Sequence, residues 1–324
     1  MSKPVQVEVV LSHVEHLPVV DVWMIVDILR ATTVMVSWFE AGGTELYPAV
    51  SLESARSLAE ALKAEGHNPL LMGEQNAIAP QGFDLGNSPL DITPELIQKR
   101  PCAVMATTNG TKAMLKAAST GTPVLVACAR NAFSALDKAL SIGRRIGIFC
   151  SGRKGRPAWD DTLCAGLLIA RLTEHFPEVR LADSARLAHL AWLASKDFAT
   201  SLKTADHAIF LSKIGYGSDI DFAAEIDVAQ LVPELFEFPN GDGMRVVLRA
   251  EGKNPKPLIL DERPLPAAPG VSGAALEVLP RATKEAGEWS SEPISPQEDR
   301  SGVGHIFFPG ESFKKQHKGK SKKA

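Results

Sequence analysis

Residues 22–33 read VWMIVDILRATT, and this stretch decides which fold to expect. Its first five residues are all apolar, which is typical of a parallel strand buried on both faces of a sheet. Asp27 follows the strand directly, and a helical pattern then runs from about Ala31 to Gly42-Gly43, where glycine is typical of a helix C-terminus. A buried strand that leads at once into a helix is the repeating element of an α/β sheet.

The same alternation continues along the chain. Ser51 is a suitable N-cap for a helix that runs to Gly66, and Thr93-Pro94 supplies an N-cap and a first-turn proline for another helix. Further strands are expected at 5–9, 45–50, 68–72, 103–106, 123–127 and 145–149, and a further helix at 160–175. The pattern predicts an α/β protein with a mainly parallel or mixed sheet and helices on both faces. Whether it forms one unit or two α/β subdomains stays open at this level.

Composition divides the chain into three segments. Residues 1–238 carry the α/β pattern and form the expected body of the protein. Residues 239–263 are predicted to form a small appendage, with strand-like runs at 244–250 and 257–261. Residues 264–324 lack hydrophobic periodicity and end in a basic stretch, Lys314–Lys323, so we expect a disordered C-terminal extension there.

The overall composition is that of an ordinary globular protein. Hydrophobic residues make up 45% of the 324, charged residues 23%, and the net charge is −3, so no general attraction to nucleic acid or membrane is expected. No signal peptide or membrane span is recognisable, and the four cysteines form no C-x-x-C pair. We therefore expect a cytoplasmic protein with reduced thiols, and homo-oligomerisation stays open.

Polar residues gather where the strands end. Glu74 follows the strand at 68–72, the loop GFDLGNSP spans 82–89, and TTNGT spans 107–111. Loops at the carboxyl edge of an open α/β sheet share one crevice, and ligands bind there. Helix N-termini at this edge present free N–H groups that attract anions. The sequence thus predicts an anion site, with phosphate as the anion that fits best.

Several charged residues near this edge could carry chemistry. Asp27 could be a Mg²⁺ ligand, a nucleophile, or simply an N-cap for the next helix. Glu74 and Asp84 come from different loops and suit Mg²⁺, which is usually held by one or two carboxylates, waters and substrate phosphate. Each could instead stabilise its own loop. Arg30 suits bidentate phosphate binding, with a surface ion pair as the alternative.

A basic loop, CSGRKGR at 150–156, precedes the last of these helices. Asp160 and Asp161 follow it, and they could cap the helix or bind a metal. The chain has no G-x-x-x-x-G-K-[ST] loop and no G-x-G-x-x-G fingerprint, which argues against ATP and NAD enzymes of those types. No Cys–His arrangement supports a cysteine nucleophile, so buried thiols are the better interpretation.

Taken in order, these motifs resemble those of the 2-phosphosulfolactate phosphatase family. The resemblance covers roughly residues 5–236, on the segments VDILRATT (26–33), GE (73–74), GFDLGNSP (82–89), TTNGT (107–111), SGRKGR (151–156), DTLCAG (161–166) and GYGSD (215–219). It implies a Mg²⁺-dependent phosphatase that converts (2R)-2-phospho-3-sulfolactate to (2R)-3-sulfolactate and phosphate. It also implies a place in coenzyme M biosynthesis or in another sulfonate pathway.

With this resemblance, we expect the following roles. The catalytic residues are Asp27, Arg30 and Asp161, and the Mg²⁺ ligands are Asp27, Glu74 and Asp161 with support from Asp84. Phosphate is held by residues with hydroxyl, amide or backbone donors: Thr32, Thr33, Asn87, Ser88, Thr108, Asn109 and Thr111. The carboxylate and sulfonate are held by Arg153, Lys154 and Arg156. Two alternatives stay open: a phosphatase for another small acidic phosphoester, and a non-catalytic anion-binding protein.

Overall fold

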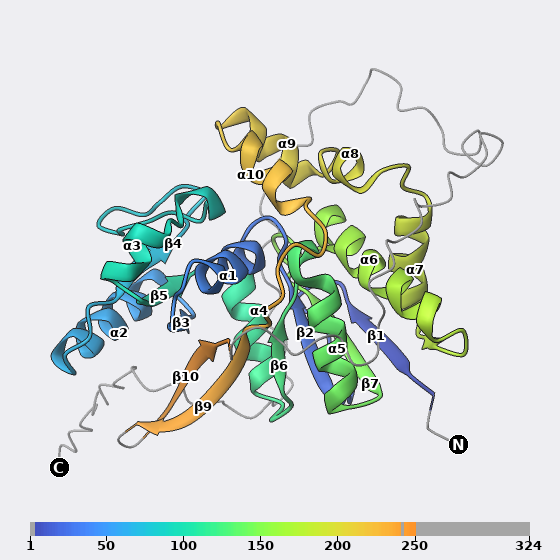
Figure 1. The fold of residues 1–324 in the computed structure, drawn as a ribbon, viewed down its shortest axis with the longest axis horizontal. Helices are drawn as coiled ribbons and strands as arrows, with labels where there is room; N and C mark the ends of the chain where they lie inside the picture. Colours follow the sequence, from blue (N-terminus) through green and yellow to red (C-terminus); the bar gives the residue numbers. More distant parts are fainter. Residues whose placement is uncertain (1–3, 241–242, 251–324) are drawn as a thin grey trace, which may run out of the picture.

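The computed structural model describes residues 4–240 and 243–250 and contains one ten-stranded sheet (Figure 1). The strands are β1 (Gln6–Val10), β2 (Val22–Val26), β3 (Glu45–Ala49), β4 (Leu70–Gly73), β5 (Cys102–Ala106), β6 (Val124–Val126), β7 (Arg145–Cys150), β8 (Arg180–Leu181), β9 (Glu234–Asn240) and β10 (Gly243–Arg249). Their order across the sheet is β4-β5-β3-β10-β9-β6-β2-β7-β1-β8.

From β2 to β8 the helices alternate with the strands, and α7 to α10 then follow one another. They are α1 (Ala31–Glu40), α2 (Leu52–Ala64), α3 (Pro94–Lys99), α4 (Gly110–Ala118), α5 (Ala132–Ile142), α6 (Trp159–His175), α7 (Asp183–Leu193), α8 (Phe198–Leu202), α9 (Asp206–Lys213) and α10 (Gly217–Ala223), with 3₁₀ turns η1 (Pro89–Asp91) and η2 (Ala129–Asn131). Ser51 caps α2 in a capping box, and Thr93 caps α3 with Pro94 in its first turn. The predicted caps and the α/β class are confirmed.

Two blocks of parallel strands make up most of the sheet. β4, β5 and β3 form one block, and β6, β2, β7, β1 and β8 form the other. The antiparallel hairpin β9–β10 lies between them, pairing with β6 on one side and with β3 on the other. Three successive antiparallel pairings therefore separate the blocks, so along the ladder β3 and β6 run in opposite directions. The sheet is mixed.

The hairpin is part of the body and not the small appendage that the sequence predicted. The expected boundary at residue 238 falls inside β9, and Val247 and Leu248 of β10 are fully buried. Their burial reflects the antiparallel pairing of Leu248 with Leu46 of β3. The predicted strand at 257–261 and the predicted disordered extension at 264–324 lie outside the described residues.

The core lies against the faces of this sheet. Helices α5, α6 and α7 pack on one another and on β2, β6, β7 and β1, whereas α1 and α4 pack between the two blocks (Figure 1). A smaller hydrophobic cluster, which includes Ala55, Leu62 and Val104, joins α2 to the three-stranded block. All five residues of β2 are buried, as expected of a central parallel strand. In the described part of the chain, no helix has the length and apolar character needed to cross a bilayer.

Candidate active site

A pocket of about 350 Å³ opens where the polar loops of both strand blocks meet. Its lining comes from the segments after β2, β4, β5 and β7, from the loop before η1, and from α9: Asp27, Leu29, Arg30, Glu74, Asn76, Ala77, Asn87, Thr107, Thr108, Asn109, Arg153, Lys154, His207 and Phe210. The twist of roughly 20–25° per strand pair accumulates over the five pairings between β5 and β2. This accumulated twist allows the carboxyl ends of both blocks to meet at one pocket, although the strands of the two blocks run in opposite directions along the ladder.

Asp27 lines the pocket and lies directly after β2. Its Oδ1 accepts a hydrogen bond from the backbone N–H of Ala31 at 3.3 Å, in the first turn of α1. A Cβ on Gly110, the first residue of α4, would lie only 2.7 Å from Asp27 Oδ2, so this glycine lets the start of a second helix approach the carboxylate. Burial is the main cause that raises the pKa of Asp27 to about 6, while interactions with Ser151 and His207 partly oppose it.

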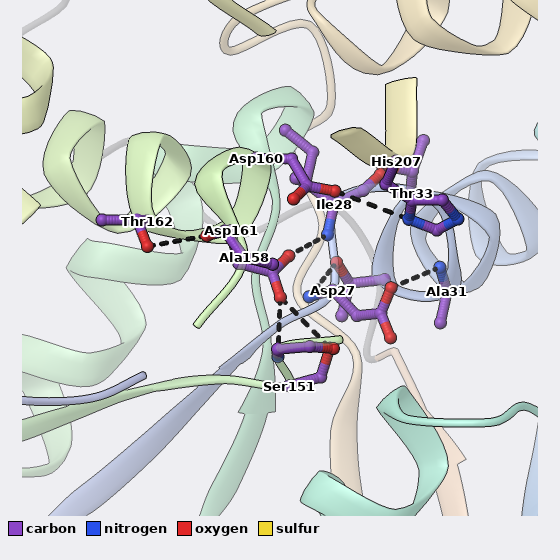
Figure 2. Close-up of polar contacts among 12 residues, drawn as sticks. Asp27, Ile28, Ala31, Thr33, Ser151, Ala158, Asp160, Asp161, Thr162 and His207 are labelled. Carbon is purple, nitrogen blue, oxygen red and sulfur yellow. Dashed lines mark hydrogen bonds and ion pairs between the residues drawn. The ribbon is translucent and has the colours of Figure 1, made fainter. Parts of the chain in front are cut away.

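Asp161 is held by the backbone around it. Figure 2 shows its carboxylate turned toward the N–H of Ile28 and toward Ser151. Ile28 N–H donates to Oδ1 at 3.0 Å, while Gly152 N–H and the Ser151 hydroxyl donate to Oδ2 at 3.0 and 3.2 Å. Burial, followed by the charges of Asp160 and Asp27, raises the pKa of Asp161 well above its ordinary value. The side chain thus joins the loops after β2 and β7 and does not line the pocket.

His207 is a pocket residue that the sequence analysis missed. It comes from α9, and its Nδ1 lies 3.6 Å from Oδ2 of the buried Asp160 (Figure 2). A carboxylate beside one ring nitrogen orients an imidazole and leaves the other nitrogen for a ligand. The sequence carried no signal for this pair, because 46 intervening positions separate the two residues and no histidine motif surrounds His207.

Glu74 lies on the opposite block, directly after β4. Its Oε1 accepts hydrogen bonds from the backbone N–H and the hydroxyl of Thr108, at 2.8 and 2.5 Å, and its Oε2 accepts one from Ala77 N–H at 2.8 Å. Asn87 lies nearby in the lining, and its buried Oδ1 has no hydrogen-bond partner among the described residues. A buried amide oxygen without a partner is costly, so a bound ligand is a good candidate to satisfy it.

Arg30 lines the pocket, and its guanidinium is also bound by groups of α10 and of the loop after β4. Its Nη1 donates to Asp219 of α10 at 2.6 Å, its Nη2 donates to the carbonyl of Ala77 at 2.6 Å, and the Tyr216 ring lies 4.3 Å from the guanidinium. Asp219 also accepts the hydroxyl of Ser88 at 2.8 Å. Arg30 does form the ion pair that the sequence offered as an alternative. The expected surface position is wrong, because the Arg30 side chain is only 1% exposed.

The basic loop forms a tight turn at the rim. Arg153 and Arg156 exchange backbone hydrogen bonds, and Gly152, Lys154 and Gly155 between or beside them have positive φ. The turn places Arg153 and Lys154 in the pocket lining, with Arg153 over the Phe210 ring, whereas Arg156 is exposed and lies outside the lining.

Other predicted site residues lie in the scaffold around the pocket. The hydroxyls of Thr32, Thr33 and Thr111 bond to backbone groups of Asp27, Ile28 and Thr107 respectively, and none of the three lines the pocket. Asp84 binds Leu71 N–H and the guanidinium of Arg100. Although burial raises its pKa, these hydrogen bonds bring the net value below the ordinary one. Asp84 also lies outside the lining, as does Ser88.

The cysteines are buried, as the sequence predicted. Burial raises the pKa of Cys150 and Cys164 well above the ordinary value. Neither thiol is therefore suited to act as a nucleophile at neutral pH.

Comparison with known proteins gives the family of this chain. A family model described as 2-phosphosulpholactate phosphatase matches residues 9–237. Two proteins named "Probable 2-phosphosulfolactate phosphatase" are similar to the chain. That of Deinococcus radiodurans is 35% identical over 221 residues, and that of Thermus thermophilus is 37% identical over 222. Each alignment covers 68% of this chain, and 89% and 90% of the two relatives. The chain therefore belongs to the 2-phosphosulpholactate phosphatase family, a family of phosphoric monoester hydrolases.

Proposed function

We propose that this chain is a Mg²⁺-dependent phosphatase that hydrolyses (2R)-2-phospho-3-sulfolactate to (2R)-3-sulfolactate and phosphate. The observation that carries the proposal is the mixed lining of the pocket. Two carboxylates, Asp27 and Glu74, share it with the imidazole of His207 and with three basic side chains, Arg30, Arg153 and Lys154. A purely anion-binding pocket has no need for carboxylates. A metal-assisted phosphatase needs carboxylates to hold the metal and basic side chains to bind the anionic substrate.

The donor set fits Mg²⁺. This ion prefers oxygen ligands and is usually held by one or two carboxylates together with waters and substrate phosphate. Asp27 and Glu74 supply those carboxylates, and the unpartnered Oδ1 of Asn87 supplies a further oxygen. Asp161 and Asp84 are weaker candidates, because both lie outside the pocket lining. The carboxylate of Asp161 joins the loops after β2 and β7, and that of Asp84 is engaged by Arg100. Bound Mg²⁺ would neutralise charge on the phosphoryl oxygens and lower the pKa of a bound water.

The remaining groups position the substrate. The N-cap residues of α1 and α4, Arg30 and Asn109, both line the pocket, and helix N-termini favour phosphate through their free N–H groups. Arg153 and Lys154 have no carboxylate within 4.0 Å among the described residues, so they can bind the carboxylate and sulfonate of the substrate. We assign Arg30 to the edge of the phosphate subsite, where Asp219 holds it in place.

His207 is suited to hydrogen-bond the oxygen that leaves phosphorus. Asp160 lies beside Nδ1, which favours the tautomer with a proton on that nitrogen and orients the ring. The other nitrogen is then available to the substrate. This role adds a residue of α9 to the site that was proposed from the sequence.

A substrate panel tests the proposal. The purified chain is treated with EDTA and assayed for phosphate release from phosphosulfolactate, other phosphorylated hydroxy acids and a phosphoester without a second anionic group. We expect activity only after Mg²⁺ is restored, with the highest kcat/KM on phosphosulfolactate. Full activity without metal would overturn the Mg²⁺ assignment, and a higher kcat/KM on another acid would select the alternative substrate class.

The basic loop supplies a matched pair of variants. Arg153→Ala removes a pocket cation, so KM for phosphosulfolactate should rise by about tenfold or more, while KM for the phosphoester without a second anion changes less. Arg156→Ala removes an exposed cation three residues away and should change neither. An equal effect of the two variants would show that the loop acts through general charge and not through a subsite.

A further inference from the structure

A second cluster of metal-ligating side chains lies at the opposite end of the three-stranded block. Cys102 is the first residue of β5, Glu45 is the first residue of β3, and the two are directly paired in register. His67 lies in the turn between α2 and β4, and β4 pairs with β5 on its other side. The cluster is therefore at the amino ends of the strands, whereas the pocket is built from residues after their carboxyl ends, such as Glu74 and Thr108.

The three side chains are already close enough to share one ion. A carboxylate oxygen of Glu45, a ring nitrogen of His67 and Sγ of Cys102 all lie within 4.8 Å of one another. Ligand atoms bound tetrahedrally to one Zn²⁺ at about 2.0–2.3 Å are roughly 3.3–3.8 Å apart, so small side-chain adjustments suffice. Among the described residues, no other group of three histidine, cysteine or acidic side chains meets this criterion.

The chemistry of the cluster selects the kind of metal. Thiolate, imidazole and carboxylate together suit Zn²⁺ and similar borderline-soft cations, and they suit Mg²⁺ poorly because it prefers oxygen ligands. We propose that Glu45, His67 and Cys102 form a Zn²⁺ site that is separate from the catalytic pocket and ties together the amino ends of β3, β4 and β5.

The surroundings of Glu45 fit this role, and they include a guanidinium that competes with the metal for the Glu45 carboxylate. The hydroxyl of Tyr47 donates to Glu45 Oε2 at 2.8 Å, and such a second contact orients a ligating carboxylate. Arg249 donates to Glu45 Oε1 through Nε at 3.0 Å and Nη2 at 2.5 Å. The Arg249 side chain is 50% exposed, and ion pairs at such positions are weak, so a divalent cation can displace it.

Cobalt titration of the full chain tests the site without reference to activity. The protein is stripped with EDTA and titrated with Co²⁺, which reports a thiolate ligand by a sulfur-to-cobalt charge-transfer absorption. We expect this absorption to saturate at about one Co²⁺ per chain and to disappear when Zn²⁺ is added in competition, because Zn²⁺ suits the same ligands. A titration without the thiolate absorption would overturn the proposal.

Variants assign the ligands. Cys102→Ser should abolish the absorption, whereas Cys128→Ser, at another buried cysteine, should retain it. His67→Gln changes an exposed residue, so it should leave the fold intact and weaken Co²⁺ binding by about tenfold or more. Absorption that survives in Cys102→Ser, or unchanged affinity in His67→Gln, would refute the assigned ligands.

Arg249→Ala gives a result that adventitious binding would not. Removing the competing guanidinium should tighten Co²⁺ binding by about tenfold, whereas a weaker affinity would contradict the placement on Glu45. Phosphatase activity of Cys102→Ser with Mg²⁺ should stay at the level of the unmodified chain, because none of the three ligands lines the catalytic pocket. The two proposals can therefore fail separately.

Discussion

Asp219→Ala is expected to destabilise the protein strongly, because it breaks a buried ion pair on one side only. The side chains of Arg30 and Asp219 are 1% and 2% exposed, and their charged atoms lie 2.6 Å apart. After the substitution, the guanidinium keeps the carbonyl of Ala77 and the ring of Tyr216 but has lost its counter-charge. The hydroxyl of Ser88 also loses its acceptor.

The size of the effect follows from burial. Removing one partner of a buried ion pair typically costs 3–5 kcal/mol, so we expect the free energy of unfolding to fall by about that amount. Asp219→Asn keeps the shape and an acceptor oxygen, so it should cost less. Replacing both partners by Met and Leu should recover much of the loss, because no uncompensated charge then remains.

Urea unfolding of the full chain, followed by circular dichroism, measures this change. Glu60→Ala is the control, since Glu60 forms an exposed ion pair with Lys63 on α2 and its removal should cost no more than about 0.5 kcal/mol. A loss below about 1 kcal/mol in Asp219→Ala would refute the reasoning. Arg30 would then be free to leave Asp219, and its direct role in phosphate binding would gain support.

Three further predictions concern titratable groups. Asp27→Asn should lower kcat/KM by about a hundredfold or more while the fold is retained, because the amide keeps the shape of the side chain but loses the charge proposed to hold Mg²⁺. A rate close to that of the unmodified chain would make Asp27 a structural cap. His207→Gln should lower kcat more than KM and alter the pH profile of kcat, whereas a purely structural role would leave that profile unchanged. Burial raises the pKa of Asp227 to about 7, against an ordinary value of 3.8, so stability should fall as pH rises from about 4 to 7. In that window the unfolded chain releases a proton that the folded chain retains, at a cost of at most about 4 kcal/mol. Asp227→Asn should remove this loss, and thermal unfolding at pH 4 and pH 8 tests it, with an unchanged pH dependence counting against it.

Local patterns explain why much of the fold could be predicted. The apolar run of β2, the Ser51 cap and the Thr93-Pro94 start are signals that neighbouring residues carry by themselves, and each matches the structure. The place of Asp27 after a buried strand follows from the same kind of signal, and so do the buried cysteines. The ordered motifs likewise indicated the family that the comparisons show.

Contacts between residues far apart in the sequence decided the parts of the fold and of the site that local patterns do not predict. Nothing in residues 234–249 signals that they enter the middle of the sheet, because the partners of this hairpin, Leu46 and Leu125, lie 202 and 109 positions before Leu248 and Glu234. The same is true of the side chains around the site. Asp219 engages Arg30 and Ser88 from α10, and His207 reaches the pocket from α9.

The sequence by itself determined the α/β class, the order of the first seven strands along the chain, and the presence of acids and basic residues in loops at strand ends. Only the tertiary structure decided which of these side chains line the pocket. Backbone donors occupy the carboxylate of Asp161, and Arg100 engages Asp84, whereas Asp27 and Glu74 line the pocket. The reason is physical. A residue type sets which bonds a side chain can make, but its neighbours in space determine which of those bonds are already satisfied and which remain for a substrate.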